Sequence, residues 1–478
     1  MTGALTLLAA VAESTRPRPV SDLARETGIG VSTVSRIAAE LASSGMLVKA
    51  GSTGIYDLGG RSMVLAATAA TPYQIEAQVV LGRLSIATGE TVCLLARADH
   101  PLRGPGFRVV SSIQPAWSLS AAGDTGTWLL DRSGAIRTAF EGAERWGARP
   151  GVSHGVTPAG VVDRVAPVWF GAGDPFGALV VRTPDFRDTG HGRAGHALRA
   201  AQARLGHHLA NVEDASGPPV GAGAAWSGDA ADSPSLEIGL RLVEQVACRP
   251  WSRARELALA VGCGPERVAR LLASAGAAGL IEGTPSAGYR ASLRLGGWYP
   301  ARLPARLVGA AGDVLSRLAD EHGICAYLTT LVGAKSITVA EAIAPGELRT
   351  ASWLNRPFPL TGSDGAPALV SAMSDADIVE LFTTTARPTG RRFPRTADDF
   401  LTVVHDLRRD RSVMISEYGE NGLASVTSPV HGLAGEVAAA VCLVGPPREV
   451  EAHRVRLHRE AIGAAETIGR RLAGDALG

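Results

Sequence analysis

Apolar residues near the start of the chain recur at helical spacing in three short segments: 5–13, 20–28 and 32–41. In the third segment Val34, Ile37 and Leu41 would face a core, while polar residues occupy the positions between them. The second and third segments are joined by Gly28-Ile-Gly30, and glycine tolerates the positive φ of a tight corner. Two short helices joined in this way predict a helix-turn-helix.

The next stretch predicts a small hairpin. Residues 45–59 have the composition of two short strands around a Gly/Ser turn, which is typical of the wing of a winged helix. We expect Ser32 to be the N-cap of the helix at 32–41, which precedes this hairpin. The polar face of that helix would then be free to enter a DNA groove.

The same arrangement returns 234 residues later. The repeated helical segments and wing are residues 240–246, 254–262, 266–272 and 279–290. Gly28 corresponds to Gly262 and Arg36 to Arg270, and Leu84 with Gly89 reappears as Leu318 with Gly323 at the same offset. A constant offset predicts two copies of one unit in a single chain.

Strand-like segments follow the helices in both copies. Residues 91–95, 161–168 and 178–181 suit an antiparallel sheet. Pro167 corresponds to Pro429, so the offset has grown to 262 and the second copy holds 28 more residues. We expect the extra residues at 393–409, a capped amphipathic helix, and a long terminal helix in each copy at 193–212 and 449–472.

Composition adds limits on function. The net charge of +1 gives no global attraction to polyanions, so any DNA surface must be local. Only two of the 47 basic residues are lysines, a bias that suits phosphate and guanine recognition but that GC-rich coding also produces. The five separated cysteines form no metal or disulfide pattern, and no segment reads as a signal peptide or membrane span. A cytoplasmic protein without cofactors is therefore expected.

These motifs resemble the IclR family of bacterial transcription regulators. The resemblance lies in the sequence from Gly28 to Arg36, the following Gly45-Met-Leu, Tyr56-Asp-Leu-Gly59, and residues 84–92. It implies a winged helix-turn-helix joined to a GAF-like effector domain that cups a small metabolite, in proteins that usually act as dimers or tetramers. Two fused copies depart from the usual single copy.

The predicted fold class is α+β, with two winged helix-turn-helix domains and two GAF-like effector domains with antiparallel sheets, arranged as an intrachain pseudo-dimer. The predicted domains are the first winged helix at 1–62, a shortened effector-like domain at 73–213, a linker at 214–234, the second winged helix at 235–296 and the second effector domain at 305–478. The Gly/Pro-rich linker would let the copies lie side by side.

The predicted partners are double-stranded operator DNA, a small-molecule effector that is an organic acid or an aromatic metabolite, and in addition a second copy of the chain. Contacts to the DNA backbone are expected from Arg16, Arg18, Lys49, Arg253, Arg255 and Arg290. The surface facing the bases is expected to hold Ser32, Thr33, Ser35, Arg36, Arg267 and Arg270. Each arginine could also be an ordinary solvated charge.

The resemblance implies a ligand pocket in the second copy, lined by Thr361, Gly362, Ser363, Glu417, Ser425 and Cys442. Backbone N–H groups at the following helix start would suit a carboxylate, whereas Glu417 and Asp364 could accept hydrogen bonds from a donor. In the first copy Asp163 takes the place of Ser425, near Arg182, so that pocket is expected to be filled or ion-paired. Ordinary turn and strand chemistry is the alternative for the serines and threonine.

The chain is expected to be a ligand-responsive regulator and not an enzyme, because no catalytic grouping is present. The two unequal copies predict an operator with unlike half-sites. The alternative is a small-molecule-binding or metabolising enzyme whose helical pairs serve oligomerisation.

Overall fold

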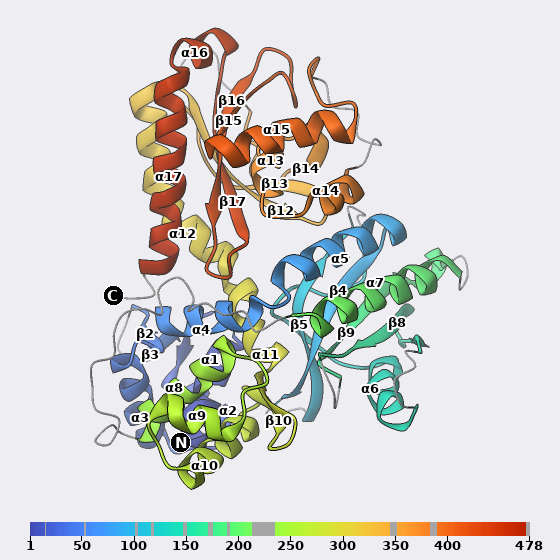
Figure 1. Cartoon of the computed structure of the whole chain (residues 1–478), viewed down its shortest axis with the longest axis vertical. Helices are drawn as coiled ribbons and strands as arrows, with labels where there is room; N and C mark the ends of the chain where they lie inside the picture. The colour runs from blue at the N-terminus through green and yellow to red at the C-terminus, as the bar shows by residue number, and fades with distance from the viewer. Residues whose placement is uncertain are drawn as a thin grey trace. The chain divides into compact units, whose positions relative to one another are not determined.

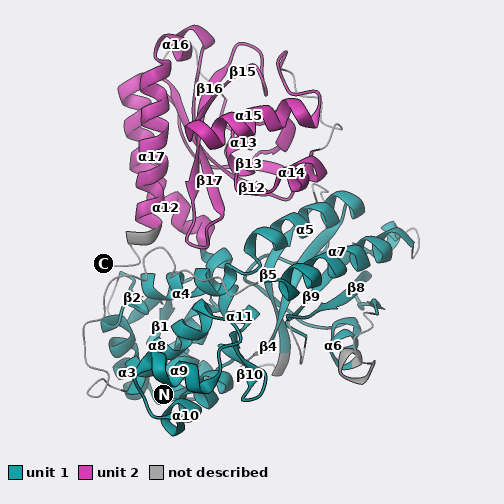
Figure 2. Ribbon diagram, viewed as in Figure 1, with its two compact units in different colours: residues 1–302, 473–478 teal, residues 303–472 magenta. Residues whose placement is uncertain are grey.

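The computed structural model describes residues 1–14, 16–51, 54–100, 104–115, 119–146, 151–170, 175–188, 192–212, 235–344, 351–382 and 390–474 (Figure 1). The chain divides into two compact units, residues 1–302 with 473–478 and residues 303–472 (Figure 2). The predicted linker at 214–234 lies outside the described residues.

The first helical module opens the chain. Its elements are α1 Thr2–Ala12, β1 Arg18–Pro19, α2 Val20–Thr27, α3 Val31–Ser43, β2 Leu47–Lys49 and β3 Ile55–Leu58. The strands form a small antiparallel sheet in the order β1-β3-β2, so a hairpin follows the helices as the hydrophobic pattern predicts. The cap of α3 differs from the prediction: Gly30 is the N-cap, and Ser32 lies exposed inside the first turn.

A second helical module has the same order of three helices and a hairpin, with only an isolated bridge from Ser252 to Tyr289 in place of β1. Its elements are α8 Ser235–Cys248, α9 Ala254–Val261, α10 Pro265–Ala277, β10 Ile281–Thr284 and β11 Gly288–Ala291. The two corners are alike, with Gly28 at φ +68° and Gly262 at φ +65°. A residue with a Cβ would be strained at either position.

The two helical modules pack against each other within the first unit. Arg61 at the start of α4 (Gly60–Ala70) pairs with two carboxylates of α8, Glu237 at 2.9 Å and Glu244 at 2.6 Å. In the other direction Arg294 of α11 (Leu293–Gly296) pairs with Glu13 at the end of α1. These ion pairs join segments more than 170 residues apart in sequence.

The first sheet has six strands in the order β6-β5-β4-β9-β8-β7. Their bounds are β4 Thr91–His100, β5 Gly104–Ile113, β6 Trp128–Leu129, β7 Ser153–Val156, β8 Val161–Val168 and β9 Gly177–Pro184. The associated helices are α5 Gln74–Thr88, α6 Ala135–Trp146, η1 Asp185–Arg187 and α7 Gly192–Ala210. In Figure 1, α5 and α7 cover one face together, and α6 lies against the other.

The second unit repeats this layout around the second sheet, in the order β14-β13-β12-β17-β16-β15. Its strands are β12 Cys325–Val332, β13 Lys335–Ala342, β14 Pro357–Pro359, β15 Val413–Ser416, β16 Ala424–His431 and β17 Val437–Gly445. Its helices are α12 Trp298–His322, η2 Leu360–Gly362, α13 Ala366–Leu369, α14 Asp375–Leu381, α15 Ala397–Asp410, α16 Pro447–Ala452 and α17 Arg454–Gly474. The single long terminal helix predicted at 449–472 is therefore two helices.

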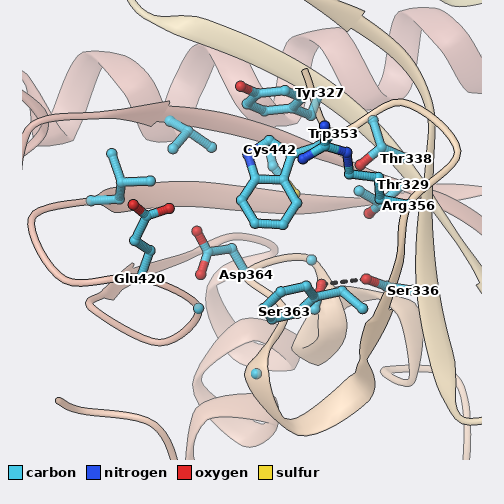
Figure 3. Close-up of a pocket in the computed structure, with 16 residues that line it drawn as sticks. Tyr327, Thr329, Ser336, Thr338, Trp353, Arg356, Ser363, Asp364, Glu420 and Cys442 are labelled. Atoms are coloured by element: carbon cyan, nitrogen blue, oxygen red, sulfur yellow. Dashed lines mark hydrogen bonds between the residues drawn. The ribbon is translucent and has the colours of Figure 1, made fainter. Parts of the chain in front are cut away.

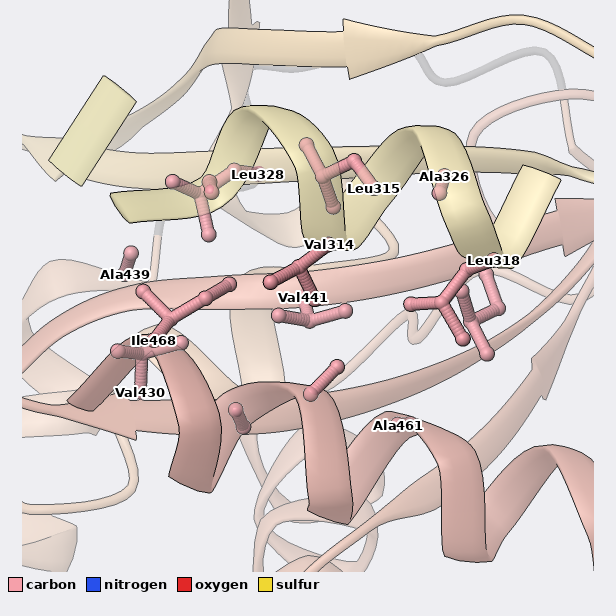
Figure 4. Close-up of a cluster of buried hydrophobic side chains, with 14 of the residues drawn as sticks. Val314, Leu315, Leu318, Ala326, Leu328, Val430, Ala439, Val441, Ala461 and Ile468 are labelled. Carbon is pink, nitrogen blue, oxygen red and sulfur yellow. The ribbon is translucent and has the colours of Figure 1, made fainter. Parts of the chain in front are cut away.

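The main core of the second unit lies between the sheet and the helices α12 and α17 (Figure 4). Leu318 of α12, Val441 of β17 and Ile468 of α17 are fully buried there. Burying one such side chain contributes about 1.5–3 kcal/mol. This packing fills one face of the sheet and leaves the other face to α13, α14 and α15.

The extra residues of the second sheet region are not where the sequence comparison placed them. Both regions have a helix just before the edge strand of the sheet, α6 before β7 and α15 before β15. The elements with no counterpart in the described part of the first region are α13 and α14, between β14 and α15. The Thr396 cap of α15 is present, bonded to Asp399 N–H at 3.1 Å.

No described helix has the length and apolar character needed to cross a bilayer. The five cysteines are unpaired. Among the described side chains, no group of three or more His, Cys, Asp or Glu residues is placed to hold a metal ion.

Candidate functional site

The polar face of α3 is exposed to solvent. Ser32, Thr33, Ser35 and Arg36 are all exposed, and the opposite side of the helix is buried against the module core. Arg36 forms an ion pair with Glu40 one turn later, at 2.8 Å. Because both side chains of this pair are well exposed, it holds the guanidinium only weakly.

The corresponding face of α10 is less uniform. Arg270 is exposed, whereas Arg267 is half-buried and donates a hydrogen bond to Ser235 Oγ at 3.2 Å. Pro265, Glu266 and Ala269 are the other exposed side chains of its first turns. The two helices therefore present different chemistry at matching positions.

The residues predicted to contact the DNA backbone fall into two groups. Arg16, Lys49, Arg253 and Arg255 are exposed at the ends of the helices and strands. Arg18 is half-buried and pairs with Glu26 at 2.6 Å, so part of its charge is already neutralised.

Arg290 does not fit its predicted role, because it is only 4% exposed. Its guanidinium lies over the rings of Trp251 and Phe176 at 5.0 Å and of Phe170 at 5.6 Å, and it pairs with Glu282 at 2.8 Å. It also donates to the Phe170 carbonyl. This arginine joins the hairpin of the second helical module to the loop after β8, and is closed off from DNA.

A cavity opens on the second sheet, on the face away from α12 and α17 (Figure 3). It has about 580 Å³ of empty space, part of it open to solvent. We call it the second-sheet cavity. Its lining is Tyr327, Thr329, Ser336, Thr338, Trp353, Arg356, Phe358, Gly362, Ser363, Asp364, Gly365, Gly419, Glu420, Leu423, Cys442 and Val444.

Asp364 is a half-buried carboxyl of this lining. Burial raises the pKa of its carboxyl to about 6, although the nearby Ser425 hydroxyl and a hydrogen bond from the Gly419 backbone oppose the rise. Burial also raises the pKa of the Cys442 thiol to about 12, so this lining thiol stays protonated at neutral pH.

Three of the six residues predicted to bind a ligand line the cavity: Gly362, Ser363 and Cys442. Ser363 accepts a hydrogen bond from Ser336 at 2.5 Å. Thr361 and Ser425 are buried and do not line the cavity, although the Ser425 hydroxyl lies near enough to Asp364 to influence the pKa of its carboxyl.

Glu417 does not line the cavity. It has a positive φ of 56°, accepts from the Gly422 N–H at 3.3 Å and faces Arg392 at 4.0 Å. These contacts hold the turn between β15 and β16. Of Glu417 and Asp364, only Asp364 lines the cavity, where its carboxyl can accept hydrogen bonds.

The backbone at the start of α13 does not offer the anion site that the sequence suggested. The helix has only four residues, the Ala366 N–H already bonds the Ser363 carbonyl at 3.1 Å, and Pro367 has no N–H. A ligand carboxylate would find few free donors there.

Sequence reasoning missed the aromatic wall of the cavity, Trp353 and Phe358, whose rings meet edge to face at 5.3 Å. It also missed Arg356 beside them and Thr329 on β12. The one available signal was the run Trp353 to Phe358, two aromatics and an arginine in six residues just before the predicted turn.

In the described part of the first sheet, an ion pair takes up the corresponding position. Asp163 lies opposite Arg182 in its strand pairing, as Ser425 lies opposite Val444 in the second sheet. Arg182 Nε donates to Asp163 at 2.8 Å, and Arg182 also donates to the Ala122 carbonyl. The expected ion pair is therefore present and occupies the space that the cavity holds in the second sheet.

Comparison with known proteins finds two matching sequence families. Residues 4–51 match the IclR helix-turn-helix domain, and residues 304–470 match the C-terminal domain of the bacterial transcriptional regulator IclR. No curated protein sequence matches the chain. Both families are parts of transcriptional regulators and not of enzymes, which confirms the expectation that this chain is not an enzyme.

Several solved structures are similar to parts of the chain. An IclR-family regulator from Rhodococcus sp. is 22% identical, and the match covers 52% of this chain and 95% of that one at a TM-score of 0.39. The repressor BlcR from Agobacterium tumefaciens is 16% identical over 50% of this chain and 97% of its own, with a TM-score of 0.34. An IclR homologue from Microbacterium hydrocarbonoxydans, solved with 4-hydroxybenzoate, is 17% identical over 50% and 99%, with a TM-score of 0.33.

Proposed function

We propose that this chain, an IclR-type DNA-binding transcriptional regulator with an effector-binding domain, reads its operator with two unequal heads and senses a ligand through one cavity. The heads are the first and second helical modules, and the sensor is the second-sheet cavity. The observation that carries the proposal is the exposed polar face of α3, whose apolar side is buried in a module that matches the family's DNA-binding domain.

The proposal of two heads in one chain is supported by the shared order of elements and by the two corner glycines at similar φ. The ion pairs of Arg61 with Glu237 and Glu244 hold the two helical modules together. One chain can therefore take the place of a symmetric dimer, which normally binds half-sites about 34 Å apart.

Fusion also removes the need for symmetry. Ser32 and Thr33 of α3 correspond to Glu266 and Arg267 of α10, and Ser35 corresponds to Ala269. Because these positions face the bases in the proposed complex, the two half-sites should differ. The arginines at 36 and 270 are the shared element.

The sensor proposal is supported by the open cavity of the second sheet and by the ion pair that fills its counterpart. Trp353 and Phe358 favour the aromatic alternative for the effector's body. Ligand binding would change operator affinity by the difference in its affinity for two arrangements of the chain, typically ~1–3 kcal/mol. Pairing of two chains stays a prediction, which mass measurement in solution tests.

The test uses the full chain and an operator fragment from a promoter-binding screen. Operator affinity should fall steeply with salt, since phosphate contacts release counterions. Arg36→Ala and Arg270→Ala should each weaken binding by about 1–3 kcal/mol and relax specificity at different half-sites. Arg317→Ala, an exposed arginine of α12 paired with Glu321, is the matched control and should change nothing.

Two results would contradict the proposal. One is duplex binding that does not depend on salt. The other is a perfect palindrome in which both arginine variants lose contact with both halves equally.

A further inference from the structure

We propose that the second-sheet cavity is selective for a small organic cation, an ammonium group on an aromatic or other apolar body, with Asp364 as its counter-ion. The inference rests on the proposed function only in calling this ligand the effector. The recognition chemistry itself depends on the cavity.

The Asp364 carboxyl lies inside the cavity with acceptor capacity to spare. A carboxylate offers about four acceptor sites. The Gly419 backbone supplies one donor from the protein side, and the Ser425 hydroxyl lies nearby without a well-formed hydrogen bond. Figure 3 shows the carboxyl facing the cavity beside Glu420. A ligand with N–H donors can therefore complete its hydrogen bonding.

An independent observation comes from the strand on the opposite wall. Thr329 is 6% exposed, and its hydroxyl has no nitrogen or oxygen partner in the described part of the chain, with only the Cys442 thiol beside it. A buried hydroxyl that has lost its water and gained no partner destabilises the structure. This orphan group lines the same cavity, so a polar ligand atom is the partner that would satisfy it.

The charge of the lining favours a cation. The side chains of the lining that carry charge at neutral pH are two acids, Asp364 and Glu420, and one base, Arg356. Within the described residues no arginine, lysine or histidine forms an ion pair with Asp364, and Arg356 is exposed. A bound ammonium would neutralise the half-buried carboxylate, whereas a bound carboxylate would add a second negative charge next to it.

The aromatic wall favours the same class of ligand. Trp353 and Phe358 meet edge to face, and Tyr327 lies across the cavity from Asp364 in Figure 3. Indole and phenyl faces attract organic cations and also bury an apolar body. The shortage of free donors at the start of α13, described above, makes it a poor place for an anion.

The pH dependence of binding should separate the two ligand classes. Asp364 must be ionised to bind an ammonium, so affinity should fall on acidification. The other titratable or charged groups around it are Glu420, Arg356, Cys442, Tyr327 and Tyr418. Burial raises the pKa of both Cys442 and Tyr418 to about 12, so neither titrates between pH 5 and pH 8.

The test uses matched probe pairs that share a skeleton: 2-phenylethylamine against 3-phenylpropionate, and tryptamine against indole-3-propionate. Binding to the full chain is measured by calorimetry at pH 7.5 and pH 5. At pH 7.5 at least one amine should bind ten times more tightly than its acid partner. Its affinity should drop several-fold at pH 5.

Asp364→Asn should cost the amine at least tenfold in affinity and narrow its advantage over the acid. Thr329→Val should cost a few-fold. Asp320→Asn, an exposed carboxylate of α12 that does not line the cavity, is the matched control and should leave both affinities unchanged.

The proposal is overturned if the acids bind better than the amines, if neither amine binds, or if Asp364→Asn leaves the amine affinity intact. Operator binding measured on the same preparation keeps the two proposals apart. Salt-dependent operator binding that only acids modulate would retain the regulator and reject the cation. Amine binding through Asp364 without operator binding would retain the cation site and reject the regulator.

Discussion

The two sheets share their strand order and their register, yet one holds a cavity and the other a packed core. On the face in question, Cys93, Val180 and Arg182 of the first sheet stand where Tyr327, Cys442 and Val444 stand in the second. The first set is covered by Phe107, Ile136 and Phe140 and closed by the Asp163–Arg182 pair. Side chains on equivalent strands, together with the added segment around α13, therefore decide whether this face of the sheet holds a cavity or a packed core.

The largest effect is expected from breaking the ion pair of the first sheet. Asp163→Ala leaves Arg182, with 8% of its side chain exposed, as an unpaired buried cation. Removing one partner of such a pair costs about 3–5 kcal/mol. Chemical denaturation of the full chain measures this loss as a decrease in the free energy of unfolding of the first unit.

The control is the double variant Asp163→Ser with Arg182→Val, which copies the residues of the second sheet. Removing both charges together should recover most of the lost stability. If the double variant is as unstable as the single one, the ion pair is not what closes the first sheet.

A smaller effect is expected from the titration of Asp364. Its pKa is about 6 in the folded chain against 3.8 ordinarily, so the folded state keeps a proton that the unfolded state loses between these values. The stability of the second unit should therefore fall as pH rises from about 4 to about 6, by about 2–3 kcal/mol. Denaturation midpoints across this range measure it.

Asp364→Asn should remove this part of the pH dependence, because an amide does not titrate. Asp320→Asn should retain it. The same slope in both variants would show that Asp364 titrates normally and that the second-sheet cavity does not desolvate it.

The smallest effect compares two glycines that lie against equivalent strands. A Cβ at Gly123 would stand 2.8 Å from Cys93 Sγ in a packed core, whereas a Cβ at Gly365 would press on the Thr329 hydroxyl, beside open space. Gly123→Ala should cost about 1–3 kcal/mol. Gly365→Ala should cost less, since Thr329 can rotate into the cavity. Equal losses of stability would mean that the two faces are equally packed.

Much of the local structure was predictable from the sequence because it depends on neighbours along the chain. The apolar spacing of Val34, Ile37 and Leu41 locates α3, and the corner glycines mark the turns. The correspondence of Asp163 with Ser425 also agrees with the strand pairing, since the insertion lies before both strands.

The misplaced residues depend on contacts between distant segments. Arg290 resembles a wing arginine until Phe170, 120 residues earlier, is seen to cover it. Trp353 and Asp364 enter the cavity because β14 and α13 place them there, and α13 has no counterpart in the described part of the first copy to compare with. Ser32 loses its cap role because the helix begins one residue before it, at Val31.

The cage around Arg290 has a mechanical consequence. The rings of Phe170 and Phe176 and the Phe170 carbonyl bind Arg290 from the first-sheet region, so a tilt of the hairpin relative to the first sheet would break all three contacts at once. The first sheet therefore serves as a rigid support for the second helical module.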